Sequence, residues 1–224
     1  MMTLSRIALL AVTSTLLLSG CAMPPRTAQD DANVHSVAIV SQLEELAPVR
    51  RIGITVFNNS KTTVDQGGKL NDIAIETTTQ HLKASHPTWT VKVANAKSAT
   101  PLGEAELAAL ARSLDVDQVF VINGTSNENS PGYGVGIVVR ALGFEPKFIT
   151  VHSFISLTVT DRNAKTVFFR NFVGDGTKAV EASKLGLKGD LSTLNDPDVR
   201  DKVSAALQAR TRESIDAILT SANY

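Results

Sequence analysis

Few side chains in this sequence are suited to chemistry: four histidines and one cysteine among 224 residues. The closest pair of histidines, His81 and His86, is five residues apart, whereas two metal ligands on one helix face stand three or four apart. No H-x-x-x-H or H-E-x-x-H pattern occurs. His152 falls on the polar face of an alternating segment, where we expect it to be solvated. The sequence therefore predicts no metal site.

Two glycine-containing segments resemble nucleotide-binding loops only in composition. The segment 65–72 (DQGGKLND) lacks the spacing of a P-loop, so we interpret it as a loop before a helix. The segment 132–136 (GYGVG) is not followed by a helix with an acidic residue, as a dinucleotide fingerprint would be. No G-x-S-x-G or S-x-x-K motif supplies a nucleophile. We expect no catalytic residue and no cofactor.

The first 20 residues have the layout of a secretory signal peptide. Arg6 ends a short basic leader, and residues 7–18 form an unbroken run of apolar and small hydroxyl residues. That run is too short for a bilayer-spanning helix, which needs about 20 residues. Small residues then lead to Cys21, the only cysteine. The sequence predicts cleavage between Gly20 and Cys21.

Residues 18–21 (LSGC) resemble the lipobox of bacterial lipoproteins in full. The resemblance implies that the Cys21 thiol carries a lipid and that its new amino group is acylated. Several acyl chains hold a protein stably on a membrane. Ala22, in place of Asp, implies export to the outer membrane. The alternatives are a free or disulfide-bonded Cys21 and an uncleaved membrane anchor.

Composition excludes several classes of partner. Removal of 20 residues from 224 leaves 204, enough for one α/β domain with a substantial core. The leader contains one basic and no acidic residue, so the 22 basic and 22 acidic residues become 21 and 22. This balance offers no basic stripe for nucleic acid.

We expect a flexible tether over residues 21–33, rich in polar residues and proline, and a single periplasmic domain over 34–224.

Periodicity predicts the elements of that domain. Strands are expected at 34–40 and 51–57, paired as a hairpin, and at 89–94, 118–122, 149–159 and 166–173. Helices are expected at 70–82, from Gly103 to Leu114, and from Pro197 onward, with a loop at 58–68 and a polar connection at 174–195. The last helix has Asp196 as its cap and a stripe formed by Val199, Val203, Leu207, Ile215 and Ile218. The order predicts one α/β domain with a mixed β-sheet and helices packed on it.

Three segments carry a family resemblance: residues 115–125 (DVDQVFVINGT), 132–139 (GYGVGIVV) and 154–171 (FISLTVTDRNAKTVFFRN). Their order is similar to that of an envelope group comprising the TolB amino-terminal domain, the lipoprotein activators of penicillin-binding proteins and the curli-secretion channel lipoproteins. The chain resembles uncharacterised proteobacterial lipoproteins more closely. Ala164 stands in the turn where that group commonly has glycine.

The glycine-rich insert at 127–146 is the most unusual segment. We consider three interpretations: a surface loop or short strand that covers a sheet edge, a partner or oligomer contact, and a membrane-inserted β-hairpin. For the contact, the candidate residues are Tyr133, Val135, Ile137 and Arg140.

These observations lead to a functional hypothesis with alternatives. We expect a non-enzymatic lipoprotein that is held in the bacterial outer membrane by the lipid on Cys21 and faces the periplasm. It would serve as an interaction or assembly module, with another envelope protein as its partner. The alternative is a subunit of an oligomeric secretion channel. A hydrolase would require a deep pocket that gathers Asp161, His152 and a hydroxyl.

Overall fold

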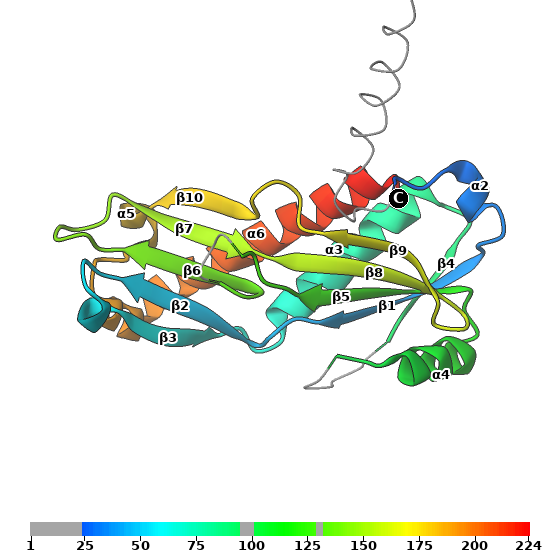
Figure 1. Ribbon diagram of the computed structural model, residues 1–224, viewed down its shortest axis with the longest axis horizontal. Helices are drawn as coiled ribbons and strands as arrows, with labels where there is room; N and C mark the ends of the chain where they lie inside the picture. The colour runs from blue at the N-terminus through cyan, green and yellow to red at the C-terminus, as the bar shows by residue number, and fades with distance from the viewer. Residues whose placement is uncertain (1–23, 95–100, 129–131) are drawn as a thin grey trace, which may run out of the picture.

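The computed structural model describes residues 24–94, 101–128 and 132–224. Ten strands in these ranges form two five-stranded sheets that follow each other along the elongated molecule (Figure 1). The first sheet has the order β4-β1-β5-β8-β9, with strands Thr90–Val93, Ser36–Gln42, Gln118–Gly124, Ile155–Asp161 and Thr166–Asn171. The second has the order β10-β7-β6-β2-β3, with strands Thr177–Glu181, Phe148–Ser153, Val135–Arg140, Leu46–Ile52 and Ser60–Asp65. Both mix parallel and antiparallel pairs, which confirms the predicted α/β class but divides the expected single sheet into two.

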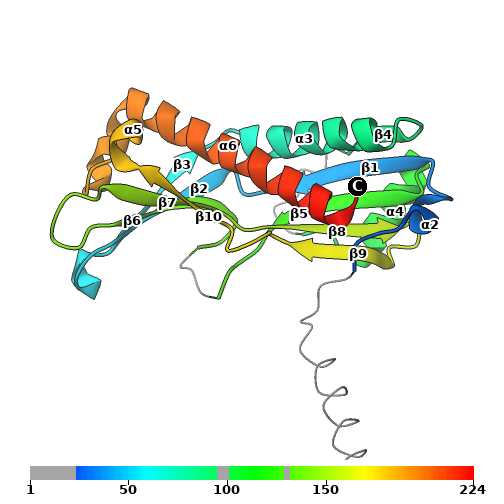
Figure 2. The ribbon, with the colours of Figure 1, turned by 90° about the horizontal axis from the view of Figure 1, so that it is seen from above.

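Three long helices cover the sheets. Helices α3 (Lys69–Ser85) and α6 (Pro197–Ala222) pack on one side, and α4 (Glu104–Leu114) packs on the opposite side of the first sheet (Figures 1 and 2). Helix α6 contacts strands of both sheets, so one apolar core runs beneath them. The short helices are α2 (Ala28–Asp31), α5 (Ala182–Leu185), η1 (Val56–Asn58) and η2 (Leu191–Asn195).

Helix α6 forms as its sequence predicts. The Asp196 side chain accepts a hydrogen bond from the Asp198 N–H at 2.9 Å, and Pro197 takes the first helical position. The predicted stripe is buried and faces the sheets: Val199, Val203, Leu207, Ile215 and Ile218. The predicted helices around residues 70–82 and 103–114 are confirmed as well.

The predicted hairpin between the first two strands is wrong. Strand β1 belongs to the first sheet and β2 to the second, and the link between them, Leu43–Glu45, carries the chain onward instead of reversing it. Asn71 of α3 fixes this link: its side chain accepts from the Leu43 N–H at 2.8 Å and donates to the Leu43 carbonyl at 2.9 Å. A tertiary contact therefore decides the path of the chain.

A second crossing divides the predicted long strand at 149–159. Strand β7 ends at Ser153 in the second sheet, and β8 begins at Ile155 in the first. Phe154 lies between them with no exposed surface; its N–H donates to the Gly134 carbonyl and its carbonyl accepts from the Thr125 N–H, both at 2.8 Å. The β8–β9 hairpin that follows is confirmed, with its turn at 161–164.

Two edge strands of the second sheet lie where loops were predicted. Strand β3 falls in the predicted loop at 58–68, and β10 falls in the predicted connection at 174–195. Both are mostly polar, and polar and charged side chains on an edge strand discourage pairing with another chain. Conversely, the strand predicted at 51–57 is wrong beyond Ile52: Ile54 and Val56 lie in an exposed loop that contains η1.

The segment that precedes β1 is packed against the domain. Arg26 is buried, and its guanidinium pairs with Asp31 at 2.5 Å and lies 5.1 Å from the centre of the Tyr224 ring. The backbone N–H of Arg26 donates a hydrogen bond to the Ala222 carbonyl. The predicted flexible tether is therefore corrected for residues 26–33. Gly20 and Cys21 lie outside the described residues. Within the described ranges, no helix combines the length and apolar character needed to cross a bilayer.

Candidate functional site

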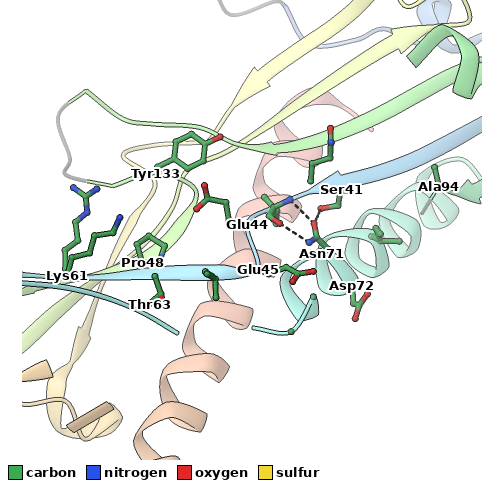
Figure 3. Close-up of a pocket in the computed structure, with 17 residues that line it drawn as sticks. Ser41, Glu44, Glu45, Pro48, Lys61, Thr63, Asn71, Asp72, Ala94 and Tyr133 are labelled. Atoms are coloured by element: carbon green, nitrogen blue, oxygen red, sulfur yellow. Dashed lines mark hydrogen bonds between the residues drawn. The ribbon is translucent and has the colours of Figure 1, made fainter. Parts of the chain in front are cut away.

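Two surface features of the domain are candidates for a binding site, and the first is a groove where the two sheets meet. It has a volume of about 870 Å³. The link between β1 and β2, the first turn of α3 and the outer face of β2 and β3 form its walls, and Tyr133 adds an aromatic ring (Figure 3). The groove therefore joins segments that are far apart in the sequence.

Charges of both signs line the groove. Glu44, Glu45 and Asp72 contribute carboxylates, and Arg50 and Lys61 contribute cations from the sheet (Figure 3). Leu46, Ile75 and Tyr133 add apolar surface, so the groove offers charge, hydrogen bonds and apolar contact together.

The described lining includes no histidine to activate a nucleophile. Its one serine, Ser41, donates its hydroxyl proton to the Asn71 side-chain oxygen at 2.8 Å. Asn71 in turn holds Leu43, as described above, which makes it a structural residue of the wall.

The structure corrects the prediction that His152 is solvated. Its side chain is fully buried in the second sheet and stacks on Phe154 at 4.9 Å. A β-carbon added at Gly132 or at Gly136 would lie 2.6 or 2.8 Å from the His152 Nε2 atom, so these glycines make the space that the imidazole fills. Burial lowers the His152 pKa from 6.5 to about 4.

The other histidines lie apart from His152. His81 Nε2 is 2.8 Å from the Tyr224 carbonyl, and His86 stacks on Trp89 at 3.8 Å. His35 is exposed at the start of β1. Among the described residues, no group of three or more histidine, cysteine or acidic side chains is placed to hold a metal ion.

The predicted contact residues divide between core and surface. Val135 and Ile137 belong to β6, the middle strand of the second sheet, and are 5% and 0% exposed. The prediction is corrected for these two, because their side chains pack in the core below the sheet. Tyr133 lines the groove and Arg140 is exposed at the end of β6, so a contact role for them stays a prediction.

The position of β6 also bears on the membrane-hairpin interpretation of the glycine-rich insert. Residues 135–139 are buried and pair with β2 on one side and β7 on the other. This stretch is a central strand of the domain, and neither a surface loop, an edge cover nor a free hairpin.

The second surface is at the far end of the second sheet, where large apolar side chains are exposed. We call it the apolar end. Two loops form it, one after β2 and one between β6 and β7 (Figures 1 and 2). Its members and their exposed fractions are Ile54 66%, Val56 77%, Phe57 94%, Leu142 52%, Phe144 75% and Phe148 50%.

Contacts hold the two loops in place. Arg51 donates to the carbonyl oxygens of Asn58 and Gly189, which ties the first loop to the segment before α6. A β-carbon on Gly143 would lie 3.1 Å from the Ile54 side chain, so the two loops touch. The Gly53 N–H donates to the Asn59 side chain at 2.9 Å. Sequence reasoning missed this surface because Ile52, Ile54 and Val56 alternate as a strand would.

Comparison with known proteins gives distant structural similarity only. No protein-family model and no curated protein matches the sequence. Two structures of the PelC dodecamer from Paraburkholderia phytofirmans are each similar to 84% of this chain, at 14% sequence identity. The similarity covers 89% of the PelC chain in the first structure and 86% in the second, with TM-scores of 0.35 and 0.34. Lipoprotein GNA1162 from Neisseria meningitidis is similar to 66% of the chain at 12% identity, covering 85% of its own chain with a TM-score of 0.33. Similarity at this level assigns no function.

Proposed function

We propose that this protein is a lipid-anchored module of the bacterial envelope that docks onto another envelope component and is not an enzyme. The Cys21 thiol would carry a lipid, the Gly20–Cys21 bond would be cut and the new amino group acylated, and the domain would face the periplasm from the outer membrane. The observation that carries the docking role is the apolar end, where six large apolar side chains are at least half exposed. Exposed apolar clusters of this kind mark interaction surfaces.

The place where the chain enters the domain supports this arrangement. Arg26 is bound to the carboxyl-terminal end of α6 through the Ala222 carbonyl, whereas Gly189, just before α6, is bound to Arg51 beside the apolar end. The described chain therefore enters the domain at one end of α6, and the apolar end lies beyond the other end of this helix (Figure 1). A domain that is held at one end and exposes apolar side chains at the other is suited to docking.

The test is the intact mass and solution size of the native protein extracted in detergent. We expect a chain that begins at Cys21, carries the added mass of acyl chains, and runs as a monomer. The matched control is Cys21→Ser, which has no thiol for the lipid and should lack that added mass. An unmodified chain that begins elsewhere would refute the anchor, and a large discrete ring would favour the secretion-channel alternative.

A further inference from the structure

Cations surround the apolar end. Arg140, Lys147 and Lys188 are exposed, and none of them forms an ion pair with another described residue. Lys147 lies 5.6 Å from the centre of the Phe148 ring, and Lys188 adjoins Gly189, which approaches Ala141 and Pro146. Arg51 and Lys61 add two more positive charges in the adjoining strands.

Glu145 and Asp190 lie in the same segments, and Glu181 lies opposite Phe148 in β10, where it pairs with Lys184 at 3.6 Å. Cations still outnumber carboxylates, so this part of the surface has an excess of positive charge. The chain as a whole has as many acidic as basic residues. The excess is therefore a local property of the apolar end.

We propose that the apolar end is a docking surface for a phospholipid bilayer that carries anionic headgroups, separate from the bilayer that holds the lipid on Cys21. Apolar side chains on protruding loops, surrounded by lysine and arginine, match a membrane surface, which has an apolar interior beneath anionic headgroups. This proposal rests on the proposed function and names the component that the module would dock onto.

The geometry places this bilayer at the end away from the anchor. Helix α6 has 26 residues and is therefore about 39 Å long. It separates the apolar end from Arg26, and the five residues from Cys21 to Arg26 reach about 17 Å when extended. This reach is less than half the length of α6, so the apolar end is clear of the anchoring bilayer when α6 points away from it.

Charge also argues against a second copy of the chain as the occupant. Two apolar ends placed against each other would bring their cations together, whereas an anionic surface would neutralise them. The exposure of the side chains points the same way, because Phe57 and Phe144 are 94% and 75% exposed and can enter an apolar layer.

A vesicle-capture experiment tests the proposal. The native lipidated protein is reconstituted into phosphatidylcholine vesicles, and fluorescent vesicles of phosphatidylcholine alone or with phosphatidylglycerol are added as the second population. We expect capture of the phosphatidylglycerol vesicles only, and less capture at high salt, which screens exposed charges. The double variant Phe57→Ser/Phe144→Ser should capture at least about tenfold fewer vesicles, because each phenylalanine adds more than about 1.4 kcal/mol, equivalent to tenfold, when buried.

The matched control is Val173→Ser, which changes an exposed apolar residue (42% exposed) outside the apolar end and should capture vesicles like the native protein. Circular dichroism of each variant shows whether it is folded. Equal capture by the double variant, or no capture of phosphatidylglycerol vesicles, would overturn the proposal. A changed oligomeric state of the double variant without capture would instead assign the surface to a second copy of the chain.

Flotation separates failure of this inference from failure of the proposed function. The protein is first floated with the phosphatidylcholine vesicles, which reports the anchor alone. If the native protein fails to float, the anchor is refuted, and direct flotation of the same protein with phosphatidylglycerol vesicles still tests the apolar end. If the protein floats with phosphatidylcholine vesicles but does not capture phosphatidylglycerol vesicles, the lipid anchor is supported and the inference about the apolar end is overturned.

Discussion

His152 fills a space inside the second sheet that two glycines leave open. It lies opposite Gly136 in the pairing of β6 with β7, and Gly132 approaches it from the segment before β6. An imidazole in this position is kept from water, and its charged form is disfavoured. This explains why Gly132 and Gly136 carry no side chain.

At the residue scale, acid should destabilise the protein through His152. Between pH 6.5 and about 4 the buried imidazole stays neutral in the folded protein, while the unfolded chain binds the proton. The free energy of unfolding should therefore rise with pH across this window, by about 3 kcal/mol in total from this group. Urea unfolding at a series of pH values measures the slope.

The variant His152→Gln should lose most of this pH dependence, because glutamine does not titrate. His86, whose pKa burial also lowers, leaves a slope of the same sign. An unchanged slope in the variant would mean that His152 is not the group responsible.

A methyl group at Gly136 should destabilise the fold. Its β-carbon would lie 2.5 Å from the Pro48 carbonyl oxygen and 2.8 Å from the imidazole, so strand or ring must move. We expect Gly136→Ala to lower the free energy of unfolding by about 1–3 kcal/mol, as overpacking of a core does. The control is Gly189→Ala, whose β-carbon would have contacts of 3.6 Å or more and should change the free energy by less than about 0.5 kcal/mol. If chemical denaturation showed that the two substitutions lower the free energy of unfolding equally, this prediction would be wrong.

At the scale of elements, Asn71 should matter more than its position on a surface helix indicates. It makes hydrogen bonds to both backbone groups of Leu43 and to the Ser41 hydroxyl. The variant Asn71→Ala should lower the free energy of unfolding by about 1–3 kcal/mol, because partly buried polar groups lose their partners. Urea denaturation measures this, with Gln80→Ala on the exposed side of α3 as the near-neutral control. An effect no larger than that of the control would show that the link does not depend on Asn71.

The same contact shows why the topology could not be predicted in full. Local periodicity correctly predicted helices α3, α4 and α6, the β4 and β5 strands and the β8–β9 hairpin. It cannot distinguish a reversal from a crossing, because the path between β1 and β2 depends on Asn71, about 30 residues away in the sequence. Edge strands such as β3 and β10 have no apolar alternation to detect.

The candidate site was less accessible to sequence reasoning than the fold. Tyr133 and Arg140 are exposed and their contact role stays a prediction, but their neighbours Val135 and Ile137 are core residues. The apolar end escaped because its first loop continues the alternation of β2. Strand β2 ends at Ile52 and the chain bends at residues 54–55, where a hydrogen bond from the Gly53 N–H to Asn59 holds the loop.

At the scale of the whole molecule, the apolar end should contribute nothing to folding stability. Phe57 and Phe144 are 94% and 75% exposed. The variant Phe57→Ser/Phe144→Ser should therefore change the free energy of unfolding by less than about 0.5 kcal/mol, and it should bind less of a dye that reports exposed apolar surface. Thermal unfolding and dye fluorescence measure the two effects.

A core substitution supplies the contrast. Phe120→Ser removes a fully buried ring and should cost at least about 3–5 kcal/mol. If the double variant at the apolar end were destabilised as much as Phe120→Ser, its two phenylalanines would be part of the fold and not of a docking surface.

Helix α6 makes the two sheets into one rigid piece. It packs on both of them, and its Ser204 and Ser214 donate hydrogen bonds to Gln66 and to the Ser153 carbonyl, close to the two places where the chain crosses between sheets. The distance between the two ends of the molecule is then set by the length of one helix. If the protein connects two surfaces, it acts as a spacer that fixes the width of the gap, and inserting or deleting turns of α6 would reset that width.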